Sequence, residues 1–501
     1  MKHIITLDVG TTSVKTALFT RAFDMVRSSS REYELLTPAS DIVELDPEMY
    51  WRSVQDGIRD ITVHSGVNPD DIAAICCTTQ GETLIPVDAE GRVLHNALVW
   101  IDARARAESE YLKEKIPNDI FYQTTGIPEI GPSCPLSKVL WFKRNRADIF
   151  GKTAYFLLLE DFLIHRLTGL FVTNPSLLSS TGYFDICKNV LWERALDAID
   201  INEKYFPKIT ACGSIAGTLR PPVASDLGLH SATAVVTGAM DQIASAIGAG
   251  NIQPGMVTET TGTALVIGAT MDTFDAACSG GVSVYRHYDR RFLMLPYCTT
   301  AGIVLKWFRD EFCTEEQTQA SVTGVSAYDL LDTLAQGVAP GCGGLLLVPN
   351  FAGKQDPAIN TAAKGVFFGV GLESQKAHFV RAIFEGVAFM LRENIEHIEK
   401  TGVAVKEIRS LGGGSKGRIW NEIKADVCGK DMITMNQTES TSLGAAILGM
   451  VALGDYPSVD AACVAACRVK NTYHPDVNNR KVYDTAYAKS LAVYRQLKEL
   501  F

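Results

Sequence analysis

An aspartate followed closely by a Gly-Thr-Thr turn opens the chain, in the segment IITLDVGTTSVKTALF at residues 4–19. A tight turn of Gly10, Thr11 and Thr12 would present backbone N–H groups and hydroxyls, which can hold a phosphate without a long glycine-rich loop. Asp8 would repel that phosphate unless it faces a divalent cation, so its position predicts a Mg²⁺ partner that is bound through water. An aspartate that only caps its own turn at a strand end is the alternative interpretation.

A second acid stands at the start of a helix in the segment VVTGAMDQIASAIGAG, residues 235–250. An apolar strand ends there, and Asp241 and Gln242 begin a helix of small residues. A carboxylate at such a loop tip is well placed to accept a proton from a substrate hydroxyl that attacks a phosphorus atom. A simple helix N-cap is the alternative role for Asp241.

Two other turns have compositions suited to a nucleotide. The segment MVTETTGTALVIGA, residues 256–269, repeats the order of strand, short Thr-Gly-Thr turn and strand that opens the chain. The segment IRSLGGGSKGRIWNEIKADV, residues 408–427, places three glycines between a strand and a helix. A flat ring can approach a glycine backbone closely, and the start of a helix favours a phosphate. The chain has neither a GxxxxGK[ST] motif nor a strand-anchored GxGxxG, so we expect no P-loop and no dinucleotide fold.

Polar residues gather with one aromatic ring at two predicted strand ends, in CTTQGETLIPVD (residues 77–88) and ALVWIDARA (residues 97–105). The candidate residues are Gln80, Glu82, Trp100, Asp102 and Arg104. They suit a polyhydroxylated ligand, because its hydroxyls take paired hydrogen bonds while its C–H face lies on a ring. A surface salt bridge between Asp102 and Arg104 is the alternative for that pair.

Strand-like β-branched runs alternate with helical patterns along the whole chain, which predicts an α/β protein. We expect early strands at IITLDV, TALFT and DIAAICCTT, and the clearest helix at residues 377–402, where apolar residues recur every three to four positions and Gly402 fits the end. The two hairpin turns, roughly 250 residues apart, predict a duplicated architecture in which each half offers one loop to a shared cleft. The Gly- and Pro-rich segment at residues 245–256 predicts a boundary near residue 250.

The bulk composition restricts the class of protein. A chain of 501 residues exceeds one ordinary core and indicates two domains or lobes. A net charge of −10 and the lack of a basic run argue against a nucleic-acid partner. The twelve cysteines form neither a CxxC pair nor a zinc-like arrangement. No apolar stretch approaches the ~20 residues of a membrane span, and no export leader is seen, so we expect a cytoplasmic protein without a membrane partner.

Taken together, these segments resemble the FGGY family of carbohydrate kinases, which belongs to the actin, Hsp70 and sugar-kinase superfamily. The DxGTTSxK opening at residues 8–15 matches, and SCPLSKVLWFKRN (residues 133–145) and GVFFGVGLESQKAHFVRAIFE (residues 365–385) agree with the two family signatures. The resemblance implies two ribonuclease-H-like domains of the actin-like ATPase fold, at residues 1–250 and 251–501, with ATP and sugar meeting in the interdomain cleft. Family members are often dimers, which favours a homodimer.

The resemblance also assigns roles to particular residues. It implies that Asp241 is the general base and that Asp8, through water, and Asp241 act on the Mg²⁺ of Mg-ATP. The expected ATP-binding residues are Gly10, Thr11, Thr12, Lys15, Thr261, Gly262, Thr263, Gly412, Gly413, Gly414 and Ser415. The expected substrate-binding residues are Gln80, Glu82, Trp100, Asp102, Arg104, Asp241 and Gln242.

The sugar-facing segment departs from the family patterns. Xylulokinase-like members carry Gln-Met-His-Gly where this chain has Gln-Gly-Glu-Thr at residues 80–83, and glycerol kinases carry an Arg-Glu pair there. Gln242 resembles glycerol kinases, whereas VWIDAR and the overall length resemble pentulose kinases. We therefore expect a ketopentose such as D-xylulose, with a linear polyol such as glycerol or erythritol as the alternative.

Two other classes stay open at this point. An ATPase of the actin or Hsp70 class shares the phosphate loops but has no need of the sugar-facing residues. A sensor that binds a sugar without phosphorylating it would be expected to lack Asp8 or Asp241, and both are present.

Overall fold

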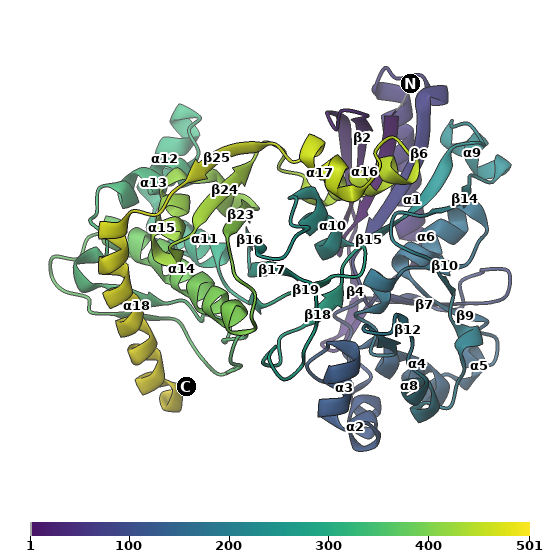
Figure 1. Cartoon of the computed structure of the whole chain (residues 1–501), viewed down its shortest axis with the longest axis horizontal. Helices are drawn as coiled ribbons and strands as arrows, with labels where there is room; N and C mark the ends of the chain where they lie inside the picture. The colour runs from purple at the N-terminus through teal and green to yellow at the C-terminus, as the bar shows by residue number, and fades with distance from the viewer. Residues whose placement is uncertain (1–2) are drawn as a thin grey trace.

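The computed structural model describes residues 3–501, which form two lobes side by side, each built on a mixed β-sheet (Figure 1). In the first sheet β1 is antiparallel to β2 and parallel to β6, and β6 is parallel to β15. The strands, in spatial order, are β14 (Ile215–Thr218), β15 (Ala234–Met240), β6 (Ile72–Thr79), β1 (His3–Val9), β2 (Ser13–Thr20) and β3 (Met25–Glu32).

The second sheet repeats this arrangement. Here β16 is antiparallel to β17 and parallel to β23, and β23 is parallel to β24. The two sheets therefore share one spatial order and one set of strand directions. The strands β3-β2-β1-β6-β15 of the first sheet correspond to β19-β17-β16-β23-β24 of the second, which confirms the predicted duplication. The strands, in spatial order, are β18 (Val284–Arg286), β19 (Phe292–Met294), β17 (Leu265–Met271), β16 (Met256–Thr261), β23 (Glu407–Leu411), β24 (Asp431–Met435) and β25 (Val469–Tyr473), with β20 (Tyr297–Cys298) on β17.

Smaller sheets and the helices complete the two lobes. The smaller sheets are β4 (Leu36–Ala39), β5 (Ile42–Leu45), β8 (Ala97–Leu98), β7 (Leu84–Val87) and β9 (Tyr155–Leu158); β10 (Val172–Thr173) with β13 (Lys208–Ile209); β11 (Phe184–Asp185) with β12 (Val190–Leu191); and β21 (Leu346–Val348) with β22 (Val366–Phe368). The helices of the first half are α1 (Pro47–His64), α2 (Arg106–Lys115), α3 (Asn118–Thr125), α4 (Pro135–Asn145), α5 (Ala147–Phe150), α6 (Leu159–Thr168), α7 (Pro175–Leu178), α8 (Glu193–Ala198), α9 (Pro221–Leu227) and α10 (Asp241–Gly248). Those of the second half are α11 (Gly302–Phe312), α12 (Thr314–Thr323), α13 (Ala327–Gln336), α14 (Lys376–Lys400), α15 (Arg418–Cys428), α16 (Ser440–Ala452), α17 (Val459–Ala466) and α18 (Val477–Leu497).

The elements expected from the sequence are confirmed. The three early strands are β1, β2 and β6, and the long amphipathic helix is α14. Gly402 follows that helix with a φ of 93°, a left-handed conformation that glycine adopts without strain. None of the helices within residues 3–501 combines the length and the apolar composition that crossing a membrane requires. The domain boundary at residue 250, the cytoplasmic location and the homodimer stay predictions.

Two helices of small residues, from different halves of the chain, pack against each other beside the first sheet. In α10 and α16 the Ser245 and Ser440 hydroxyls lie 2.9 Å apart, and a Cβ atom at Gly444 would lie 1.8 Å from the Ala244 carbonyl oxygen. The glycine therefore allows the two backbones to touch. Although α16 comes from the C-terminal half of the chain, it packs on β1 and β6 of the first sheet, as its yellow ribbon in Figure 1 shows.

Candidate active site

The register of three parallel strands brings the two candidate carboxylates to one edge of the first sheet. Val9 of β1 pairs with Thr79 of β6, and Thr79 pairs with Met240 of β15. Asp8 immediately precedes this row, and Asp241 immediately follows it. The carboxyl ends of parallel strands are the usual place for ligands in α/β sheets, because loops from successive strands converge there.

The Gly-Thr-Thr turn leaves its hydroxyl-bearing tip accessible. The Gly10 N–H donates to the Ser13 carbonyl (2.9 Å), which closes the turn, and the Tyr33 hydroxyl donates to the Gly10 carbonyl from behind. Thr11 is half-buried and Thr12 is exposed at the tip. The turn is therefore braced on one side and open on the other, as a phosphate-binding loop requires.

Asp8 lies beside Lys15, its partner in the register of β1 and β2. Burial raises the pKa of Asp8 to about 6; the Lys15 charge lowers this pKa, and the Glu439 charge raises it. Lys15 forms an ion pair with Glu439, which precedes α16. Lys15 thus connects the first sheet to a segment from the other half of the chain.

The surroundings of Asp8 suit a hydrated cation. No hydrogen-bond donor within residues 3–501 engages the Asp8 side chain, so its oxygens remain free to accept from metal-bound water. No cluster of three or more His, Cys, Asp or Glu side chains in the same range could hold a metal. A Mg²⁺ ion at Asp8 would therefore take its other ligands from water and from phosphate oxygens, as Mg²⁺ commonly does.

Asp241 is the first residue of α10, and one of its carboxylate oxygens accepts the Gln242 backbone N–H at 2.7 Å. Burial raises the pKa of Asp241 to about 7; the charges of Asp8 and Glu82 raise it further, and the Gln242 N–H lowers it. The charges of Asp8 and Glu82 thus both act on Asp241 across this edge. A pKa near neutrality suits a general base at physiological pH. The Gln242 side chain is half-buried beside it.

A buried polar network beneath β15 supports the loop that carries Asp241. One carboxylate oxygen of Glu160 accepts the Gly238 N–H (3.0 Å) and the side-chain amide of Asn174 (3.1 Å). The Ser176 hydroxyl accepts the Met240 N–H (2.9 Å) and donates to Asn174 (2.6 Å). Our sequence analysis missed this network. A signal was available, because the acids Glu160 and Asp161 interrupt an apolar run at residues 155–164.

Gln80 and Glu82, two of the predicted substrate-binding residues, follow β6 at the same edge. The Gln80 amide nitrogen donates to the Tyr50 hydroxyl (3.1 Å), while its oxygen is buried without a hydrogen-bond partner among residues 3–501. Glu82 has a φ of 66°, which is uncommon for a residue with a side chain. Burial raises the pKa of Glu82, and the positive charge of Lys138 lowers it.

Lys138 holds together the two loops that carry the predicted sugar-binding residues. This residue of α4 is fully buried, and its ammonium group donates to the carbonyls of Val99 (2.9 Å), Glu82 (3.3 Å) and Trp100 (3.3 Å). Trp100 is 41% exposed, and its indole N–H donates to the Thr11 hydroxyl at 2.9 Å. Trp100 therefore joins the predicted sugar-binding loops to the predicted phosphate turn, a contact that sequence spacing could not reveal.

Asp102 and Arg104 belong to a buried ion-pair cluster. The Asp102 carboxylate accepts the Val43 N–H (2.7 Å), and the Arg104 guanidinium donates to Asp102 (2.7 Å) and Glu44 (2.7 Å). The expected salt bridge is present, but it is buried, so its placement at the surface is wrong. Direct contact of Asp102 or Arg104 with a sugar stays a prediction. The ion-pair cluster with Glu44 positions the loop after β8.

The Thr-Gly-Thr turn of the second half rests on a fully buried ion pair. Lys424 and Glu259 are in contact at 2.7 Å with both side chains excluded from solvent. The Thr261 hydroxyl accepts from Lys424 (2.9 Å) and donates to Glu259 (2.7 Å), so it faces inward. Thr263 remains exposed at the tip, and the Gly262 N–H closes the turn on the Ala264 carbonyl (3.0 Å).

A cavity of about 500 Å³ opens beside this turn, within the size range of small-molecule sites. Predicted residues that line it are Thr261, Gly262, Thr263, Gly413 and Gly414. Gly412 and Ser415 lie outside the lining and close their own turn, through a hydrogen bond from the Ser415 hydroxyl to the Gly412 carbonyl (2.8 Å). Sequence analysis missed other lining residues, among them Tyr328, Asp332, Phe384 and Trp420. Aromatic residues and glycines around one cavity suit the flat base of a nucleotide.

Removing Lys424 is expected to destabilise the protein strongly. A Lys424→Met substitution leaves the Glu259 carboxylate buried and unpaired, which costs about 3–5 kcal/mol in the free energy of unfolding, measured by urea denaturation. A double variant, Glu259→Leu with Lys424→Met, removes both charges and is expected to cost less than the sum of the two single variants. A double-variant cost equal to that sum would contradict the role of this pair.

Comparison with known proteins gives a consistent result. A model described as the FGGY family of carbohydrate kinases, N-terminal domain, matches residues 3–248, and the model of the C-terminal domain matches residues 256–453. A gluconokinase from Bacillus subtilis (strain 168) is 30% identical over 462 residues, which cover 92% of this chain and 89% of the relative. A xylulose kinase from the same organism is 28% identical over 501 residues, which cover 100% of this chain and 98% of the relative.

Solved structures show the same fold. A ligand-bound xylulose kinase from Lactobacillus acidophilus superimposes with a TM-score of 0.89 at 26% identity, covering 99% of this chain and 98% of the other. A gluconate kinase from the same organism gives a TM-score of 0.88 at 25% identity, with coverage of 99% and 98%. These likenesses confirm the two-domain α/β architecture of the actin-like ATPase fold.

Proposed function

Because the chain belongs to the FGGY family of carbohydrate kinases, and is thus an ATP-dependent sugar kinase, we propose that it transfers the γ-phosphoryl group of ATP to D-xylulose or a related ketopentose. The shared edge of the first sheet supports this proposal. Asp8, Glu82 and Asp241 lie close enough there for the charges of the first two to raise the pKa of the third.

The charge of this edge is the observation that favours a neutral sugar. Lys138 is engaged with three backbone carbonyls, and Lys15 is paired with Glu439. An acidic sugar would bring a further negative charge to a place where carboxylates already repel one another. A ketopentose offers only hydroxyl and carbonyl groups, which the Gln80 amide and the Glu82 carboxylate can bind.

The proposed chemistry depends on positioning and electrostatics, because phosphoryl transfer passes through a loose transition state. Asp241 would orient the attacking sugar hydroxyl and accept its proton. Threonine hydroxyls and N–H groups of the two turns, around Thr12 and Thr263, would donate to phosphate oxygens. Mg²⁺, held at Asp8 through water, would offset phosphate charge when bound. Exclusion of water by the two lobes would protect ATP from hydrolysis.

D-gluconate is the second candidate substrate. The gluconokinase from Bacillus subtilis is 30% identical to this chain, and a gluconate kinase is among the similar solved structures. An aldonate would need a cation near its carboxylate. Lys138, whose charge acts on Glu82, is a candidate, but its ammonium group would first have to leave its carbonyl partners.

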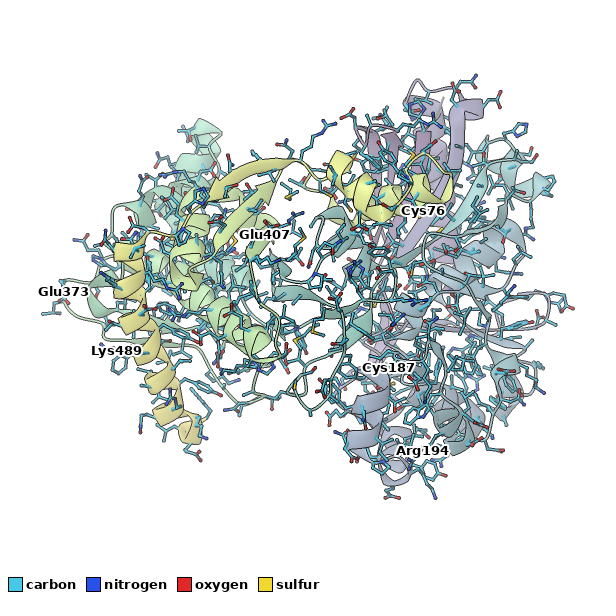
Figure 2. All side chains as sticks on the ribbon, viewed as in Figure 1. Cys76, Cys187, Arg194, Glu373, Glu407 and Lys489 are labelled. Atoms are coloured by element: carbon cyan, nitrogen blue, oxygen red, sulfur yellow. The ribbon has the colours of Figure 1, made fainter. Side chains whose placement is uncertain are left out.

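The pH dependence of kcat/KM tests the assignment of Asp241 as the general base. Since only the deprotonated form of Asp241 can accept a proton, kcat/KM is expected to rise as the pH increases through about 7 and then to level off. Glu82→Gln removes a charge that raises the pKa of Asp241, so it is expected to shift the midpoint to lower pH. Glu373→Gln, an exposed change on the far lobe, serves as the control (Figure 2). An unchanged or higher midpoint in Glu82→Gln would argue against this assignment.

A coupled assay of ADP release tests the substrate. We expect D-xylulose to give the highest kcat/KM in a panel with D-gluconate, glycerol and erythritol, because it fits a site that is rich in carboxylates. Faster turnover of D-gluconate would replace the proposal with its second candidate, and faster turnover of glycerol or erythritol would make the enzyme a polyol kinase. ADP release that is independent of every sugar would overturn the proposed transfer.

A further inference from the structure

A second cavity, of about 760 Å³, lies where the two lobes meet. Its walls come from the β18–β19 hairpin of the C-terminal lobe and, in the N-terminal lobe, from the β11–β12 turn and the segment that follows β13. Cys187 lines this cavity, and Figure 2 labels it on the N-terminal lobe. None of the residues assigned above to ATP or sugar lines it. We call this space the junction cavity.

The junction cavity contains a buried arginine, Arg286, without an ion-pair partner among residues 3–501; burial lowers its pKa, and the charge of Asp289 raises it. Arg286 is 8% exposed, and no carboxylate within residues 3–501 lies within ion-pair distance of it. One guanidinium nitrogen donates to the Arg290 carbonyl (3.1 Å), the group lies over the Phe292 ring, and its Nε is buried without a partner. Burial of a cation without its counter-ion is costly, so this arrangement favours an anionic ligand.

The rim of the junction cavity adds positive charge. Lys188 and Arg290 are exposed there, and Asn189 offers an amide. The acids nearby are already paired, since Asp185 contacts Lys188 (3.0 Å) and Asp289 contacts Arg291 (2.7 Å). Of the charged residues that line the cavity, Arg286 and Arg290 therefore form no ion pair within residues 3–501, in a chain whose net charge is −10.

We propose that the junction cavity is an effector site for a small phosphorylated metabolite. Guanidinium groups bind phosphate through paired, charge-assisted hydrogen bonds, and Arg286 and Arg290 would supply them. The volume exceeds what a free phosphate needs and falls in the range of pockets that enclose an organic ligand. The site therefore binds a metabolite through its phosphate, with the remaining part of the molecule against Phe274 and Phe292.

Two contacts connect the junction cavity to Asn174 and Ser179, the residues that flank α7. The backbone N–H of Arg286 donates to the Ser179 hydroxyl (2.9 Å), across the boundary between the lobes. Cys212, which lines the cavity, contacts the Asn174 side chain (3.4 Å), and Asn174 belongs to the network beneath Asp241. A ligand that bridges walls from both lobes changes their relative position and thereby the rate of phosphoryl transfer.

Thiol footprinting tests occupancy directly, with ribose 5-phosphate as the probe. Cys187 and Cys278 are both exposed, and only Cys187 lines the junction cavity. Mass spectrometry after iodoacetamide treatment is expected to show that ribose 5-phosphate slows alkylation of Cys187 at least threefold and leaves Cys278 unchanged. Equal slowing of both thiols, no slowing, or equal protection by inorganic phosphate alone would contradict a metabolite site.

Variants of the rim complete the test without disturbing the core. Lys188→Glu and Arg290→Glu are surface changes, and each is expected to abolish protection of Cys187 while retaining kinase activity without the probe. Lys489→Glu, on α18 of the far lobe, is the charge-matched control (Figure 2). In the wild type, ribose 5-phosphate is expected to change kcat at least twofold, and this change should disappear in both rim variants. Protection that survives the rim variants, or protection without a rate change, would overturn the proposal.

Discussion

The candidate active site depends on one constraint, the register of three parallel strands. Val9, Thr79 and Met240 pair side by side, so the residues next to them arrive at the same edge of the first sheet. A slip of one residue would turn Asp8 or Asp241 to the opposite face. The buried network around Glu160 and Ser176 binds the N–H groups of Gly238 and Met240, just before Asp241, and so opposes such a slip.

The duplicated sheet explains why the two halves have similar turns with different chemistry. The turn after β1 has Asp8 before it and donors at its tip, whereas the corresponding turn after β16 rests on the Lys424–Glu259 ion pair. The first half therefore carries free carboxylates, and the second half buries its charges beneath a cavity suited to a nucleoside. Close contact of α10 with α16 at Gly444 joins the halves where their chemistry must meet.

Much of the fold could be predicted from the sequence because its signals are local. Strand patterns, glycine-rich turns and acids at strand ends identified β1, β6, α14 and the edge that holds Asp8 and Asp241. The partners of Lys138, Glu160 and Lys424 could not be predicted, because each is a contact between segments far apart in the chain. The inward orientation of the Thr261 hydroxyl was also hidden, since it depends on a lysine more than 160 residues away.

The central claim is that Asp241 acts as the general base at this edge and does not contribute to ATP binding. Its most direct test measures ATP binding by calorimetry and sugar-dependent turnover in the Asp241→Asn variant, beside Asp119→Asn as an exposed control. The account predicts ATP affinity close to that of the wild type and a loss of turnover of about 10²- to 10⁴-fold, the usual contribution of a positioned base. Near-normal turnover in Asp241→Asn would contradict it.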